Sequence, residues 1–157
     1  MKRILVFFLA GILTASGRAG SYSPELVKKA EAGDSQSQCA LGHYYFHGDG
    51  VPRDLKESFK WSKKSAEQGN AEAEAELALC YQLGRGVEVN FNESLKWRVK
   101  SAEHGNMGSQ WQLANFYLLG AGVPKDEKEA IKWLTKASDQ GFEPAKRKLQ
   151  EIQPQAK

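Results

Sequence analysis

Three side chains that can bind a metal ion follow one another at four-residue spacing in the first third of the chain. They are Cys39, His43 and His47. In a helix this spacing stacks side chains along one face, and a thiolate with imidazoles is a ligand set for zinc or copper. One helix supplies only three ligands here, and His47 precedes Gly48, where a helix can end. The alternative is three unrelated polar side chains.

Cys39 and His43 are also the candidate pair for nucleophilic catalysis, because an imidazole beside a thiol can generate a reactive thiolate. The remaining histidine, His104, is interpreted as a surface variant at the end of a helix. The sequence shows no Ser-His-Asp or Cys-His-Asp set. A four-residue helical step more often makes a contact than a catalytic pair. The sequence therefore favours a non-catalytic protein.

A Gly-x-Gly-Val string occurs three times, starting at Gly48, Gly84 and Gly120. A phosphate-binding loop follows a strand and opens a helix with a Lys-Ser/Thr pair or a third glycine. Here each string follows a helical pattern and recurs. It therefore predicts a structural turn in which glycine closes a helix in the left-handed conformation.

The elements that position these residues repeat every 36 residues without a gap. Residues of four types keep this step: Trp61, Trp97 and Trp133; Leu41, Leu77, Leu113 and Leu149; Tyr45, Tyr81 and Tyr117; Gly33, Gly69, Gly105 and Gly141. A period of this length indicates a stack of small units. Such an array offers a long surface rather than a ready-made catalytic pocket.

The residue pattern within each unit predicts two helices. In the second unit, helix A covers 71–83, where apolar residues recur with a 3.6-residue period, and helix B covers 90–104. Asn90 is placed as the N-cap of helix B, and Glu93 stands three residues on, which is the layout of a capping box. The sequence thus predicts an all-α solenoid of antiparallel helix pairs.

The predicted solenoid domain spans residues 20–157. Its three full units cover about 33–68, 69–104 and 105–140, and half units at 23–32 and 141–152 cap the ends, which makes eight helices. Polar, atypical end units are what a finite solenoid needs.

Residues 1–19 have the layout of a secretory signal peptide. Lys2 and Arg3 precede the apolar run 4–13, and small residues follow, so that cleavage after Gly17 or after Ala19 fits. The run is too short for a membrane span, which needs about 20 apolar residues. No cysteine follows it closely, which argues against lipid modification. We expect a periplasmic or secreted protein without a stable membrane span after cleavage.

The charge balance gives no support for a nucleic-acid or membrane partner. The chain has 22 basic and 19 acidic residues, and removal of Lys2, Arg3 and Arg18 leaves 19 of each. The basic character therefore belongs to the export signal and not to the domain.

The two cysteines are not expected to form a disulfide within the chain. Cys39 and Cys80 lie one repeat plus five residues apart, and equivalent helices about 8–10 Å apart hold their Cα atoms beyond the roughly 6.8 Å limit for a bridge. Cys80 aligns with Tyr44 and Phe116, which predicts a small buried residue.

The repeated string Leu-Gly-x-x-Tyr-x-x-Gly-x-Gly-Val, followed by Asp, Lys, Trp and Lys-x-Ala-x-x-Gly, resembles the Sel1-like repeat. The match covers residues 24 to 152 and is clearest at Leu41, Gly42, Tyr45, Gly48, Gly50, Val51, Asp54, Lys60, Trp61, Lys64, Ala66 and Gly69. This family is similar to tetratricopeptide repeats. The resemblance implies a right-handed α/α superhelix whose A helices line a concave groove, and an adaptor or scaffold function.

The resemblance also implies which residues face the groove. They are the positions where the units differ from one another: Cys39, His43, Phe46, His47, Glu72, Glu76, Leu79, Gln82, Trp111, Gln112, Asn115 and Leu118. Trp111 stands out because tryptophan is a frequent binding hot spot. It is either an anchor for a partner or a side chain folded onto a neighbouring B helix.

The sequence therefore predicts a monomeric, non-catalytic adaptor or scaffold of the bacterial cell envelope that binds a protein or peptide and needs no cofactor. One alternative is a penicillin-recognising or thiol-dependent envelope hydrolase using Cys39 and His43. Cysteine-rich secreted members of the family bind penicillins and carry a cysteine pair in each repeat, which this chain lacks. The other alternative is a small metal-binding envelope protein.

Overall fold

The computed structural model describes residues 21–152. Within this range the chain forms eight helices and no strand, with bounds α1 Pro24–Glu31, α2 Ser35–His47, α3 Leu55–Ala66, α4 Ala71–Leu83, α5 Phe91–Glu103, α6 Met107–Leu119, α7 Glu127–Asp139 and α8 Glu143–Ile152. The expected signal peptide, with its cleavage sites after Gly17 or Ala19, lies outside the described residues. None of the described helices combines the length and the apolar character that a membrane crossing requires.

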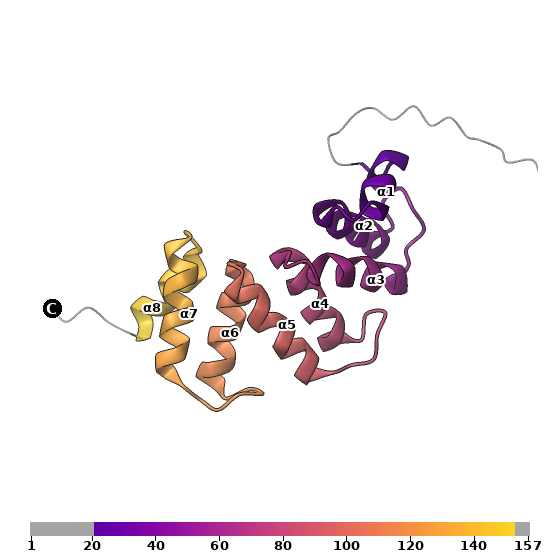
Figure 1. Cartoon of the computed structure of the whole chain (residues 1–157). Helices are drawn as coiled ribbons and strands as arrows, with labels where there is room; N and C mark the ends of the chain where they lie inside the picture. Colours follow the sequence, from indigo (N-terminus) through magenta and orange to yellow (C-terminus); the bar gives the residue numbers. More distant parts are fainter. Residues whose placement is uncertain (1–20, 153–157) are drawn as a thin grey trace, which may run out of the picture.

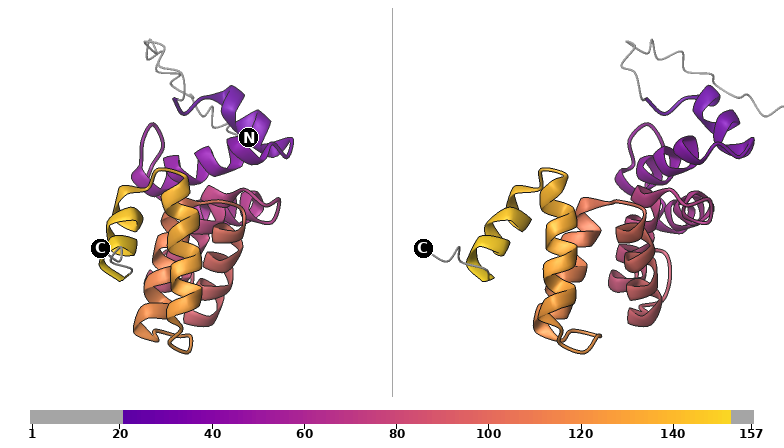
Figure 2. Two further views of the ribbon diagram at one scale, coloured as in Figure 1. Left: turned by 90° about the vertical axis from the view of Figure 1, so that its left-hand side faces the viewer. Right: turned by 60° about the vertical axis from the view of Figure 1, so that its left-hand side comes forward.

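The helices form a single file of antiparallel pairs, which confirms the predicted all-α solenoid. The A helices α2, α4 and α6 pack against the B helices α3, α5 and α7 of the same unit, and each B helix packs against the next A helix. Helices α1 and α8 close the two ends, and the file follows an arc between them (Figure 1). The two further views also place α1 and α8 at opposite ends (Figure 2).

Helix A of the second unit has the predicted bounds, 71–83, and glycines end the A helices as predicted. Asp34, Asn70 and Asn106 cap the first turns with their side-chain oxygens. The last turns close at glycines with left-handed backbone, as at Gly84 with φ 69°. The Gly-x-Gly-Val strings are therefore turns between helices A and B.

The N-caps of the B helices are Asp54, Asn90 and Asp126, as predicted. The second hydrogen bond of the predicted capping box, from the backbone N–H of the cap to the Glu93 side chain, does not form. The backbone N–H of Asn90 donates to the carbonyl oxygen of Tyr81 at 2.8 Å, and Glu93 pairs instead with Lys96 at 3.3 Å. The carbonyls of a last helical turn have no partner within their own helix. The turn folds back over helix A, so that the backbone N–H of Asn90 provides a hydrogen bond to one of these carbonyls, that of Tyr81.

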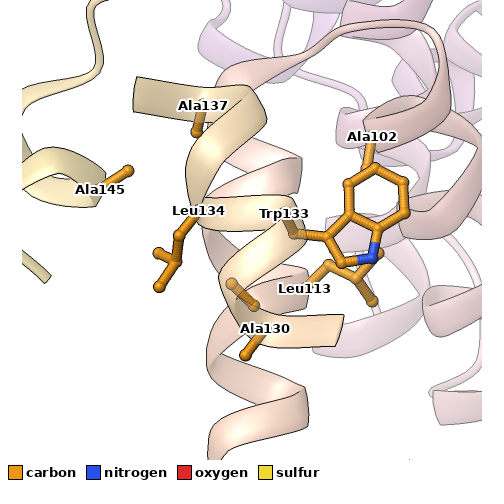
Figure 3. Close-up of a cluster of buried hydrophobic side chains, with 8 residues drawn as sticks. Ala102, Leu113, Ala130, Trp133, Leu134, Ala137 and Ala145 are labelled. Atoms are coloured by element: carbon orange, nitrogen blue, oxygen red, sulfur yellow. The ribbon is translucent and has the colours of Figure 1, made fainter. Parts of the chain in front are cut away.

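The three repeated tryptophans are buried between units, each 6–8% exposed. In the third unit the Trp133 ring extends towards Ala102 of α5 and Leu113 of α6 (Figure 3). A lysine three residues after each tryptophan lies over its ring; for Trp133 this is Lys136, 4.4 Å from the ring centroid. The aliphatic lysine stem covers apolar surface while its charge stays in water.

Each unit also closes on itself through polar links between residues 30 positions apart. The Ser101 hydroxyl donates to the Ala71 carbonyl at 2.7 Å. The side chains of Gln68 and Gln38 are joined at 2.7 Å, and the equivalent Gln140–Gln110 link is 2.8 Å.

His104 occupies the equivalent position in the second unit and lies at the surface as predicted, but it is paired with a buried side chain. Its Nδ1 lies 2.8 Å from Oε2 of Glu74, whose side chain is 1% exposed. This unit therefore replaces the amide pair of its neighbours with an imidazole and a buried carboxylate.

Candidate functional site

The A-type helices α2, α4, α6 and α8 meet at three equivalent junctions, which together we call the A face. Each junction brings together the same four repeat positions, two from one helix and two from the next. The first holds Cys39, His43, Glu72 and Glu76; the second holds Ala75, Leu79, Gly108 and Gln112; the third holds Trp111, Asn115, Pro144 and Lys148. Stacking therefore does not dictate the residue types at these positions.

The first junction gathers a set of metal-ligand groups different from the one the spacing predicts. Ligand atoms of Cys39, His43 and Glu72 all lie within 4.8 Å of one another, and Nε2 of His43 lies 3.7 Å from Oε1 of Glu76. His47 is outside this cluster. It is the exposed last residue of α2, and its ring meets the edge of Phe46 with centroids 4.8 Å apart.

The two cysteines are free and buried. Burial, with Glu72 and Glu76 as secondary causes, raises the pKa of the Cys39 thiol to about 12. Burial likewise raises the pKa of Cys80 to about 11. A nucleophilic cysteine needs a stabilised thiolate, and the surroundings of Cys39 act in the opposite direction. This geometry disfavours the thiol-dependent hydrolase.

Cys39 is expected to react with iodoacetamide at neutral pH about a hundredfold more slowly than an unstructured cysteine, because its thiolate fraction is so small. The rate should rise with pH, since the raised pKa moves ionisation to alkaline solution. Mass spectrometry of the timed reaction measures it. In denaturant both cysteines should label at the ordinary rate, whereas fast labelling of the native protein would revive the hydrolase hypothesis.

The second junction contains a buried cation that comes from a B helix. Arg98 of α5 is 1% exposed and donates hydrogen bonds to the side-chain oxygens of Gln82, at 2.8 Å, and Gln112. Within residues 21–152 it makes no ion pair, and its Nε has no hydrogen-bond partner. Burial lowers the pKa of the guanidinium, which nevertheless stays charged because arginine is not deprotonated in proteins.

The third junction is an open hollow of about 370 Å³ lined by aromatic, amide and charged side chains. Trp111 lines it while its ring packs against Phe142, with centroids 6.1 Å apart. The half-buried side chain also packs against the hydrophobic core of the third unit, to which the B helices α5 and α7 contribute. The Asn115 amide donates to the Trp111 carbonyl, and Lys148 pairs with Glu151 at 2.7 Å.

Two further predicted residues lie near the loop end of the A face. Phe46 is half-buried, and the guanidinium groups of Arg53 and Arg85 lie 5.8 and 4.7 Å from its ring centroid. Leu118, at the equivalent position two units on, packs against the hydrophobic core of the third unit.

Sequence reasoning missed Arg98 and Glu74. Arg98 departs from the repeat, since Ser62 and Leu134 stand at its equivalent positions. It lies on a B helix, whereas the groove residues were expected on the A helices alone. Glu74 and His104 both depart from glutamine within one unit. A comparison of positions 30 residues apart would have shown that the two changes belong together.

Comparison with known families identifies the repeat. A family model described as Sel1 repeat matches residues 35–70, 71–106 and 108–142. The comparison with curated proteins gives no match.

Solved structures show the same architecture. A Sel1 repeat protein from Oxalobacter formigenes is 36% identical, with a TM-score of 0.76 over 81% of this chain and 96% of that one. The protective antigen c5321 of uropathogenic Escherichia coli, described as displaying an SLR fold, is 34% identical with a TM-score of 0.75, over 81% of this chain and 27% of the antigen. Helicobacter pylori cysteine rich protein B, 21% identical with a TM-score of 0.61 over 77% of this chain and 86% of its own, shares the fold.

Proposed function

We propose that this chain, which belongs to the Sel1 repeat family, is a monomeric, non-catalytic adaptor that binds an acidic peptide segment of a partner along the A face. The family typically provides protein-interaction scaffolds, so a protein partner is the general expectation. The charges at the second and third junctions support the more specific choice of an acidic segment.

Arg98 is the observation that carries this proposal. Burial of a charge without an ionised partner is costly, and the equivalent residues Ser62 and Leu134 indicate that the stack does not require it. Its acceptors are neutral amide oxygens, and the Gln112 side chain is exposed. A carboxylate that displaces Gln112 would replace an uncharged acceptor with an anion and give the buried guanidinium an ion pair.

The third junction extends this preference along the same face. Arg147 and Lys148 line its hollow together with Trp111 and Glu151. Glu151 pairs with Lys148, which leaves Arg147 as the cationic group beside the apolar ring. A peptide that places one carboxylate on Arg98 and continues over Trp111 meets positive charge at both steps.

We also propose that the adaptor acts in the bacterial periplasm or outside the cell. The support is the arrangement of Lys2, Arg3, the apolar run 4–13 and the small residues that follow it. N-terminal sequencing of the exported protein would test this, and a retained Met1 would contradict it.

Arg98→Met is expected to weaken peptide binding at least tenfold, equivalent to about 1.4 kcal/mol, without loss of fold. Random dodecapeptides displayed on phage are selected on residues 20–157 and should become enriched in Asp and Glu. Fluorescence anisotropy of the best synthetic peptide then measures affinity. Methionine has a similar volume, and replacing a buried charge by an apolar residue is often neutral or stabilising, so the variant should unfold no earlier than the wild type.

The matched control is Lys128→Met, which removes one positive charge from an exposed position on α7 and should leave affinity unchanged. Neutralising the peptide's acidic residue should weaken binding to the wild type but not further weaken binding to Arg98→Met. The proposal fails if selection shows no acidic preference, or if Arg98→Met binds the peptide as tightly as the wild type.

A further inference from the structure

The first junction carries a chemistry different from the other two. Cys39 and His43 of α2 face Glu72 and Glu76 of α4, so a thiol, an imidazole and two carboxylates converge from two units. At the second junction the same positions hold Ala75, Leu79, Gly108 and Gln112. The stack therefore forms without any of these ligand groups.

The imidazole of His43 gives an independent indication of a ligand. Its Nε2 is enclosed and has no hydrogen-bond partner among the described residues. The Glu76 oxygen at 3.7 Å is too distant for a hydrogen bond, which ends near 3.2 Å. Two ligands bonded at 2.0–2.1 Å to one tetrahedral zinc ion lie about 3.3 Å apart. The observed separation is thus close to that of two ligands of one ion.

We propose that the first junction is a binding site for zinc, with Cys39 Sγ, a ring nitrogen of His43 and the Glu72 carboxylate as ligands and Glu76 completing the tetrahedron. Thiolate and imidazole groups select zinc or copper over calcium and magnesium. Cys39 is 5% exposed and fixed in the core, whereas Glu72 is exposed. The Glu72 side chain can therefore rotate to close the 4.8 Å spacing to bonding distance.

Binding is an exchange of one proton for one metal bond. Zn²⁺ displaces the proton of the Cys39 thiol, the sulfur–zinc bond forms, and the proton passes to the buffer. The thiolate and the two carboxylates bring three negative charges to the divalent ion, so the filled site keeps one net negative charge. No oxidation or reduction takes place.

The ion would join two units that lack one hydrogen bond found between other neighbouring units. Gln38 and Gln110 each donate a hydrogen bond to a carbonyl of the preceding B-type helix, at Ala30 and Ala102. Glu74 stands at the equivalent position in the second unit, and its carboxylate has no N–H to donate. Zinc bonded to α2 and α4 would hold together these same two units.

Zinc chloride alone, titrated by calorimetry into tag-free protein with reduced cysteines, tests the site. We expect one equivalent to bind with a dissociation constant below about 1 µM and to raise the unfolding temperature. Cobalt(II) should give the intense visible bands of tetrahedral coordination and a sulfur-to-cobalt charge-transfer band.

His43→Ala should weaken zinc binding at least a hundredfold, and Glu72→Gln about tenfold. Both side chains are solvent-accessible, so these variants test the site even if Cys39→Ser folds poorly. The controls are His47→Ala, which removes an exposed imidazole one turn away, and Cys80→Ser, which removes a buried thiol outside the cluster; both should bind zinc like the wild type. The proposal is overturned if zinc does not bind, if affinity survives His43→Ala, or if His47→Ala abolishes binding equally.

Discussion

Gly86→Ala is expected to destabilise the protein by about 3–5 kcal/mol, from left-handed backbone strain and overpacking together. Gly86 has φ +74°, and an added Cβ would lie 2.0 Å from the carbonyl oxygen of Leu55, the first residue of α3. The turn of the second unit therefore rests directly on the helix of the first. Thermal unfolding followed by circular dichroism should show a midpoint about 10 °C lower or more.

Gly122→Ala is the matched control in the next unit. Gly122 has nearly the same backbone, with φ +75°, but nothing lies within 4 Å of the position of a Cβ. Only the conformational cost remains, about 1–2 kcal/mol. Equal losses at the two sites would show that the Leu55 contact contributes nothing to stability.

His104→Ala is expected to cost about 2–3 kcal/mol of unfolding free energy, because it leaves the Glu74 carboxylate buried without its hydrogen-bond donor. The loss stays below that of a fully buried pair, since His104 is half exposed and water can partly replace it. Urea denaturation measures the effect.

The double substitution Glu74→Gln, His104→Gln should bring stability back to within about 1 kcal/mol of the wild type. It recreates the amide pair of the Gln38–Gln68 and Gln110–Gln140 links. The glutamine introduced at position 74 can also donate to the Ala66 carbonyl, just as Gln38 and Gln110 donate to the equivalent carbonyls of Ala30 and Ala102. A double variant as unstable as His104→Ala would contradict the idea that the pair is a local replacement.

The repeat made the fold predictable in detail. Trp97 and Gly84 recur in register, so each assignment was supported at three places, and helix A of the second unit ends at Leu83 as expected. The capping box failed because local spacing places Glu93 near the cap, whereas the competing acceptor, the Tyr81 carbonyl, belongs to another helix.

The site was less predictable because its contacts join different units. Spacing along α2 singled out Cys39 and His43, which the structure brings together, but it proposed His47, from the same helix, where the structure brings Glu72 from α4. Arg98 escaped notice because a long side chain on a B helix can reach the face formed by the A helices. Its partners, Gln82 and Gln112, were both predicted, but nothing in the linear pattern indicates that one guanidinium joins them.

The links between residues 30 positions apart have a consequence for how such chains can be recombined. Glu74 with His104, and Ser101 with the Ala71 carbonyl, lie within residues 69–104. A duplication or transplant of that whole segment carries both partners of each link to the new location. An exchange of α4 alone would set a buried carboxylate against a glutamine from another copy. The helix pair, rather than the single helix, is therefore the module that gene duplication or a protein engineer can move without breaking an internal bond.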